Sequence, residues 1–215
     1  MSTQSPAAQR PARKTRRTAD SPEGAASARC PLTPEVWIEA ATEVLVNQGI
    51  DHVRVDLLAQ QLNVTRGSFY WHFRDREELL RSVLRNWHQM ATELLTLRLE
   101  HAHSDPREQL RDVISLPFRG RSAARAARIE LAIRAWARRD DMARHAVDEA
   151  DANRIAYIAQ VFSGLGFAPA EARSRAFLLY SYVVAESLMS QSGSAAQRDA
   201  RDRLVEQLLM LPLPT

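Results

Sequence analysis

Apolar residues along this chain recur at the three- and four-residue spacing of amphipathic helices. The segment 53–73 carries the most informative pattern. In its first half Val55, Leu58, Ala59 and Leu62 fall on one helical face, which is expected to pack inward. Asn63 follows, and because asparagine tolerates a left-handed backbone, the chain is predicted to turn sharply there.

A second helix is predicted to start at Arg66. Thr65 suits its N-cap, and Val64 and Phe69 have the spacing of a hydrophobic staple. Phe69 and Phe73 share one face of this helix and are expected to reach the core. Two short helices joined by a tight turn are typical of a helix-turn-helix unit.

The opposite face of the second helix carries no core residues. Gly67, Ser68 and Trp71 lie on it, flanked by Tyr70 and His72. A small residue that permits close approach, next to hydroxyl and aromatic groups, is what a DNA groove reader needs. An ordinary helical hairpin with core aromatics is the alternative that periodicity alone leaves open.

Helical patterning continues over the remainder, which predicts an all-α fold. Thr33 and Pro34 start a helix that Gly49 ends, and Asp75 with Glu78 resembles a capping box at the next start. The predicted further helices are 75–103, 106 to about 117, 121–138, 140–163, 169–191 and 197–211.

The segment from Pro169 to Gln191 has large apolar residues around most of the helix. Such a helix must be buried on several sides, so we expect one side to face a partner subunit. The expected interface residues are Tyr182, Leu188, Met189, Leu204, Leu208 and Leu211. A large monomeric core is the equal alternative from the residues alone.

The composition is that of an ordinary soluble protein, with 215 residues, 45% hydrophobic content and one cysteine, Cys30. No stretch of 18 or more apolar residues is present and no leucine-rich signal segment begins the chain, so a cytoplasmic location is expected.

Positive charge is concentrated at the N-terminus. Residues 1–33 contain six basic and two acidic residues, a balance of +4, whereas the whole chain is +3. Residues 1–32 are therefore predicted to be a disordered basic arm that touches DNA phosphates or a minor groove. A solvated tail without a role is the equal alternative.

The chain offers little for catalysis or metal binding. His101 and His103 lie on different sides of a helix and no cysteine pair supports them, so neither a metal nor another cofactor is expected. The acidic cluster of Asp148, Glu149 and Asp151 is interpreted as a solvated surface that Arg144 and Arg154 neutralise along the same helix. Without a phosphate loop or a nucleophile elbow, no enzyme is predicted.

The segment 53–73, together with the residues on either side of it, resembles the DNA-binding domain of TetR-type regulators. The matching residues are Gly49, Leu58-Ala59, the run from Val64 to Phe73, Asp75, and Glu78-Leu79-Leu80. The chain departs from the family pattern at Arg54, where threonine often caps the helix, at Asp56, where a basic or small polar residue is common, and at Asn63.

The resemblance implies three parts: the arm at 1–32, a helix-turn-helix DNA-binding domain at 33–78, and a helical ligand-binding and dimerisation domain at 79–215. Arg66, Ser68 and Trp71 are expected to contact base edges of double-stranded DNA, with Gly67 allowing close approach. The residues expected to position the DNA backbone are Arg54, Thr65, Tyr70, His72 and Arg74.

The family's small-molecule pocket implies a further site in the C-terminal domain. The residues that would line it are Phe118, Trp136, Tyr157, Phe162 and Tyr180, although core packing explains them equally well. The predicted function is a homodimeric repressor that binds an inverted-repeat operator and is released by a small molecule. An activator, a regulator without ligand, and a helical interaction protein that does not read DNA are the alternatives.

Overall fold

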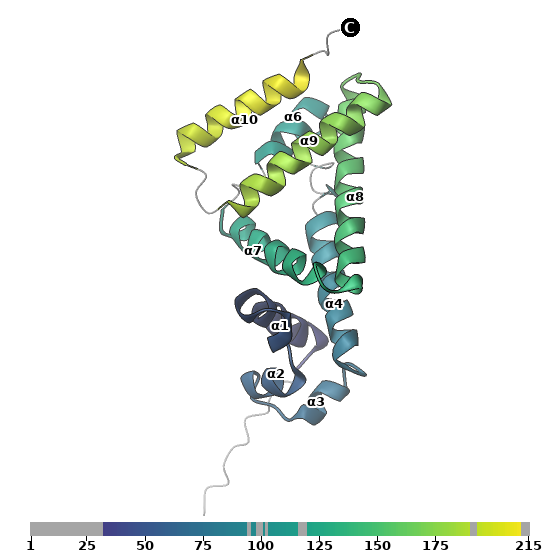
Figure 1. The fold of residues 1–215 in the computed structure, drawn as a ribbon, viewed down its shortest axis with the longest axis vertical. Helices are drawn as coiled ribbons and strands as arrows, with labels where there is room; N and C mark the ends of the chain where they lie inside the picture. The colour runs from purple at the N-terminus through teal and green to yellow at the C-terminus, as the bar shows by residue number, and fades with distance from the viewer. Residues whose placement is uncertain are drawn as a thin grey trace, which may run out of the picture. The chain divides into compact units, whose positions relative to one another are not determined.

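A computed structural model of the protein describes residues 32–93, 96–97, 101, 103–115, 120–189 and 193–211. Within these ranges the chain forms helices and no strand, which confirms the all-α fold class (Figure 1). The basic arm, apart from Leu32, and the predicted ligand residue Phe118 lie outside the described residues. Leu32 itself packs against the first core. None of the described helices combines the length and apolar character needed to cross a membrane.

Three helices build the N-terminal head: α1 (Pro34–Gln48), α2 (Val55–Gln61) and α3 (Arg66–Tyr70), with a 3-10 turn, η1 (Ile50–His52), after α1. Phe69 is fully buried and meets the ring of Trp37 edge to face, with 5.3 Å between the ring centroids. It also stacks on Phe73 at 5.4 Å. Because α3 has only five residues, this aromatic contact rather than helix propensity holds it in place.

The turn between α2 and α3 forms as predicted. Asn63 has a φ of 54°, in the left-handed region. The backbone N–H of Val64 donates to the carbonyl of Ala59 at 2.9 Å and that of Asn63 donates to Gln60 at 3.1 Å, the two bonds of a Schellman motif. The end of α2 is thus satisfied within the turn, and α3 starts at a fixed angle.

The two predicted N-cap positions are confirmed, but the capping hydrogen bonds are absent. Thr33 and Thr65 occupy N-cap positions with extended backbone, but neither side chain makes a capping hydrogen bond. Thr33 is engaged by the carboxylate of Glu35 instead, and this hydrogen bond is the largest cause of the lowered pKa of Glu35. For Thr65 we have no physical account of the missing cap.

Helix α4 (Arg76–His88) starts at Asp75, whose carboxylate accepts a hydrogen bond from the backbone N–H of Glu78 at 2.8 Å. Glu78 does not return this bond to Asp75 and accepts from the N–H of Arg74 instead, at 2.7 Å. The guanidinium of Arg76 donates to the carbonyls of Val53 and Ile50 at 2.5 and 2.8 Å, which fixes α4 to the head.

The predicted helix from Asp75 to about His103 is not an α-helix throughout. The α-helix ends at His88, and Gln89–Glu93 form a π-helical turn, η2. Apolar spacing of three and four residues cannot register such a turn, because it inserts one residue without interrupting the helical path.

The C-terminal helices are α6 (Pro106–Ser115), α7 (Gly120–Ala137), α8 (Asp141–Gly164), α9 (Pro169–Leu188) and α10 (Ala195–Met210). Helices α8 and α9 pack along one another, and α7 contacts both (Figure 1). Arg175 on α9 is buried and donates to the carbonyls of Leu209 and Leu211, which satisfies the end of α10.

Two hydrophobic cores hold the described body together. The second is formed by α6, α8, α9 and α10 around Phe162 and Leu179. The first begins in the head and continues through α4 into α7 and α8, where Ile133, Trp136 and Val147 belong to it. The head is therefore packed against α7 and α8, and the boundary after residue 78 stays a prediction.

Candidate functional site

Helix α3 and its flanks present the candidate recognition surface. Trp71 is 87% exposed and Tyr70 is 55% exposed. Phe69, on the face of α3 that packs on the core, is fully buried. Seven of the nine predicted contact residues are exposed, and Ser68 and His72 are half-buried; the exposed ones are Arg54, Thr65, Arg66, Gly67, Tyr70, Trp71 and Arg74. The fold holds this polar and aromatic face toward solvent.

The cations on this surface differ in what they contact. Arg54 forms a two-pronged ion pair with Asp56, with N–O distances of 2.9 and 3.2 Å, and Arg74 pairs with Asp75 at 3.1 Å. Among the described residues no carboxylate lies within ion-pair distance of Arg66. Exposed pairs of this kind are weak and exchange readily with other anions.

The fold does not require a glycine at position 67. The Gly67 backbone is not left-handed, and an added Cβ would meet only the Thr65 hydroxyl, at an ordinary contact distance of 3.6 Å. A glycine that nothing inside the protein demands leaves the start of α3 open to close approach from outside.

A second candidate site is a cavity of about 670 Å³. Residues of α1, α4, η2, α6, α7, α8 and α9 line it, among them Thr42, Val83, Val113, Ala126, Ile158 and Val183. Its walls are mainly apolar, with a few polar groups, as in small-molecule sites of proteins.

Two of the predicted ligand residues, Tyr157 and Tyr180, line this cavity. The other two described ones, Phe162 and Trp136, do not line it. Phe162 is fully buried in the second core, where it meets the ring of Phe167 at 5.8 Å. Trp136 is 2% exposed and packs in the first core against the head.

A network of four charged residues and one tyrosine borders the cavity, and three of its members, Glu130, Arg154 and Tyr180, line it. Glu130 accepts hydrogen bonds from Arg134, Arg154 and the indole of Trp87, at 2.8, 3.1 and 3.2 Å. Arg134 also binds Asp151, and the hydroxyl of Tyr180 donates to the same carboxylate at 2.5 Å. The network joins α4, α7, α8 and α9 across the cavity.

The sequence interpretation of the acidic cluster missed this network. Arg154 does not neutralise Asp148 along α8 but pairs with Glu130 on α7, and Asp151 pairs with Arg134 on α7. Arg144 lies 3.8 Å from Asp141. Helical spacing identifies only neighbours on the same helix, so it could not predict ion pairs between two helices. Among the residues that the structure describes, no cluster of three or more metal-ligating side chains occurs.

Because Tyr180 is buried, the stability of the protein should fall as the pH becomes alkaline. Burial is the largest cause that raises the pKa of Tyr180, to about 12, against the opposing charge of Arg154. The folded state holds this proton more tightly than the unfolded chain, so the stabilisation is complete below pH 10 and is lost as the pH rises to about 12. Lys14 is the only lysine of the chain, so amines contribute little in this range.

We expect urea unfolding between pH 9 and pH 12 to show a loss of stability that is about 2 kcal/mol smaller in Tyr180→Phe than in the wild type. Tyr70→Phe, which removes an exposed hydroxyl, is the matched control and should follow the wild type. Equal losses in the wild type and Tyr180→Phe would contradict the role of this hydroxyl.

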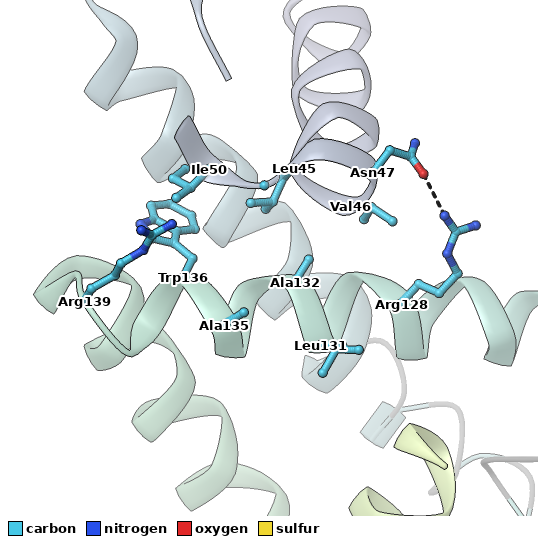
Figure 2. Close-up of a pocket in the computed structure, with 11 residues that line it drawn as sticks. Leu45, Val46, Asn47, Ile50, Arg128, Leu131, Ala132, Ala135, Trp136 and Arg139 are labelled. Atoms are coloured by element: carbon cyan, nitrogen blue, oxygen red, sulfur yellow. Dashed lines mark hydrogen bonds between the residues drawn. The ribbon is translucent and has the colours of Figure 1, made fainter. Parts of the chain in front are cut away.

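A smaller hollow of about 320 Å³ lies between α1 and α7. Figure 2 shows Trp136 beneath Ile50 and Leu45 at one end, and Arg128 donating to the side chain of Asn47 at the other, at 2.7 Å. Arg139 is paired with Asp51 at 3.0 Å. These contacts tie the head to α7.

Exposed apolar residues gather on α9 and α10. Four of the predicted interface residues are more than half exposed: Met189, Leu204, Leu208 and Leu211. Tyr182 and Leu188 are half-buried, and the Tyr182 hydroxyl donates to Asp202 within the chain. Phe177 and Leu178 on α9 are 58% and 60% exposed and were missed as interface candidates, although they belong to the apolar run that suggested a partner.

Comparisons with known proteins agree with this architecture. Residues 38–83 match the family model "Bacterial regulatory proteins, tetR family". The regulator SrpR of Pseudomonas putida is 47% identical over 47 residues, which are 22% of this chain and 22% of SrpR. The class C tetracycline repressor of Escherichia coli is 29% identical over 180 residues, covering 82% of this chain and 73% of the repressor.

Solved structures share the fold. A transcriptional regulator from Saccharomonospora viridis, solved in complex with choline, superposes with a TM-score of 0.66 at 17% identity, over 82% of this chain and 94% of its own. The family-model match runs from α1 into α4, and the structural match extends the likeness through the C-terminal helices. The match to the family model identifies residues 38–83 as a TetR-type segment, and the structural match shows that the described C-terminal helices share the fold of a solved transcriptional regulator.

Proposed function

We propose that this protein is a homodimeric transcriptional repressor that binds an inverted-repeat operator through α3 and is released from it by a small molecule. The observation that carries the proposal is the exposed face of α3, where Trp71 is 87% exposed beside Arg66. The tryptophan and arginine side chains stand on a helix packed on the core, so both are free to meet base edges in a DNA groove.

The proposed dimer would use the apolar surface of α9 and α10. Phe177, Leu178, Leu204 and Leu208 are each more than half exposed in the single chain. Two copies related by a two-fold axis would bury these residues in a four-helix interface and would present two recognition helices. Light scattering coupled to size-exclusion chromatography should give twice the mass of one chain, and a persistent monomer would exclude this arrangement.

Release by a ligand is supported by the position of the large cavity. Glu39 and Thr42 of α1 line it together with Tyr180 and Val183 of α9. A molecule in this cavity would therefore touch both the head and the proposed dimer helix. It would act as an inducer if it binds the DNA-incompetent arrangement more tightly than the competent one.

The test of DNA reading is selection of bound sequences from a random duplex pool with the full chain. We expect an inverted repeat with half-sites separated by about one helical turn. Absence of any enriched sequence would overturn the proposal. It would favour the second candidate, a helical interaction protein without sequence-specific DNA binding, for which the Arg54–Asp56 ion pair is the supporting observation.

That ion pair leads to a prediction about affinity. Asp56 holds both prongs of the Arg54 guanidinium, so in Asp56→Asn the cation would be free to bind a phosphate. We expect Asp56→Asn to bind the selected duplex more tightly, with a log–log salt slope steeper by about one. Fluorescence anisotropy across a salt series measures both quantities. In the double variant Arg54→Ala, Asp56→Asn the gain should disappear, and an unchanged slope in Asp56→Asn would contradict the competition.

A further inference from the structure

The charged residues that line the large cavity are paired with one another. Glu39 contacts Arg125, and Glu130 contacts Arg154 at 3.1 Å. Arg134 and Asp151 complete the buried network behind Glu130. The four charged groups of this network, two guanidiniums and two carboxylates, sum to zero charge.

This balance disfavours an ionic ligand of either sign. An anion bound at the buried wall would have to take Arg154 from Glu130, and would leave a carboxylate whose side chain is only 11% exposed without that partner. A cation would have to take Glu130 from its two arginines. The indole face of Trp87, a surface that suits quaternary ammonium groups, has the Arg154 guanidinium 5.5 Å from its ring centroid.

One buried hydroxyl of the cavity is available to a ligand. Thr92, on the π-helical turn, is 5% exposed, and its hydroxyl finds no hydrogen-bond partner among the residues that the structure describes. A hydroxyl can both donate and accept, so it pairs with a neutral polar group without any change of charge. The surrounding wall is apolar, with Met90, Ile129, Ile158 and Val184 among its residues.

We infer that the effector is an electrically neutral amphiphile, with an apolar body and a single hydrogen-bonding head group of the alcohol type that binds Thr92. The inference rests on the proposed function, because it names the ligand class of the proposed effector cavity. It separates this chain from the choline-bound regulator of similar fold, since the aromatic face that would hold a cation is covered by Arg154.

The first test compares three probes that share a ten-carbon chain and differ in charge: 1-decanol, decanoate and decyltrimethylammonium. Thermal melting and tryptophan fluorescence of the full wild-type chain measure binding at equal concentrations, below the solubility and micelle limits. We expect 1-decanol to bind at least about tenfold more tightly than either ion. Equal or tighter binding of an ion, or no binding of any of the three, would overturn the inference.

The second test uses the available hydroxyl. Thr92→Val, which keeps the shape of the side chain, should weaken 1-decanol binding about fivefold, and Thr92→Ser should keep most of it. Unchanged binding in Thr92→Val would exclude this residue as the head-group partner.

The third test shifts the charge balance. In Glu130→Gln two guanidiniums keep only one carboxylate, so the preference should move from 1-decanol toward decanoate. Glu77→Gln, which removes an exposed partner of Arg81 away from the cavity, is the matched control and should keep the wild-type order. A folded Glu130→Gln protein that still prefers 1-decanol would contradict the argument. If this variant does not fold, the wild-type and Thr92 measurements decide.

Failure of the inference and failure of the proposed function give different results. Probe binding is measured without DNA, and duplex selection is performed without a probe. If the chain selects an operator but binds decanoate best, only the proposed ligand class is refuted. If it prefers 1-decanol but selects no duplex, the proposed DNA-binding function is refuted and the ligand site stands.

Discussion

The double variant Arg66→Ala, Trp71→Ala is expected to bind the selected operator at least about 30-fold more weakly than the wild type, because each base-edge contact contributes about 1–3 kcal/mol. The fold should not change. Trp71 is 87% exposed, and among the described residues Arg66 has no carboxylate partner, so neither substitution removes packing or an ion pair. The phosphate contacts would remain, and weak binding at low salt should persist for any sequence.

Fluorescence anisotropy with the selected duplex and with a scrambled duplex measures this effect, and circular dichroism checks the fold. The matched control is Leu131→Ala, Arg138→Ala on α7 and just after it, which removes one exposed apolar and one exposed basic side chain outside the proposed surface. Its affinity should equal that of the wild type. Unchanged operator affinity in the Arg66 and Trp71 variant would contradict the assignment of the recognition face.

The head was predictable from the sequence because its determinants are local. The left-handed Asn63, the buried Phe69 and Phe73, and the exposed Trp71 all follow from residue spacing over about ten positions. Gly49 ends α1 with a φ of 85°, as expected for a glycine that stops a helix. The family resemblance rests on the same segment.

The cavity was predictable only in part, because its walls come from helices far apart in the sequence. Large aromatic residues were its expected lining, yet Phe162 and Trp136 fill the two cores, where their apolar area is best buried. The walls combine Tyr157 and Tyr180 with small and medium residues such as Ala126 and Val183. Where a space remains depends on how these side chains from several helices pack together, which the residues of one helix do not reveal.

The buried charge network was missed for a related reason. Glu130 and Arg134 are four residues apart and look like an ordinary surface pair on α7. Burial changes their role, since Arg154 reaches the same Glu130 from α8 and the Tyr180 hydroxyl reaches Asp151 from α9. Such a network depends on how α7, α8 and α9 pack, and this packing is not encoded in any one helix.

Removing the centre of that network should destabilise the protein strongly. In Glu130→Ala the guanidinium of Arg154, whose side chain is 14% exposed, loses its carboxylate, and the indole N–H of Trp87 loses its acceptor. We expect a cost of about 3–5 kcal/mol, because an uncompensated charge stays buried. Chemical denaturation at fixed protein concentration measures this difference, and at roughly 2–4 °C per kcal/mol the melting temperature should fall by about 10 °C.

The control Glu77→Ala breaks an exposed ion pair with Arg81 on α4 and should cost no more than about 1 kcal/mol. The double variant Glu130→Leu, Arg154→Met removes both buried charges together, so much of the loss should be recovered through apolar packing. If Glu130→Ala is as mild as Glu77→Ala, Arg154 must be solvated in the folded protein, and the charge-balanced wall of the cavity would lose its basis. If the double variant is as unstable as the single one, side-chain packing rather than charge pairing holds α4, α7, α8 and α9 together.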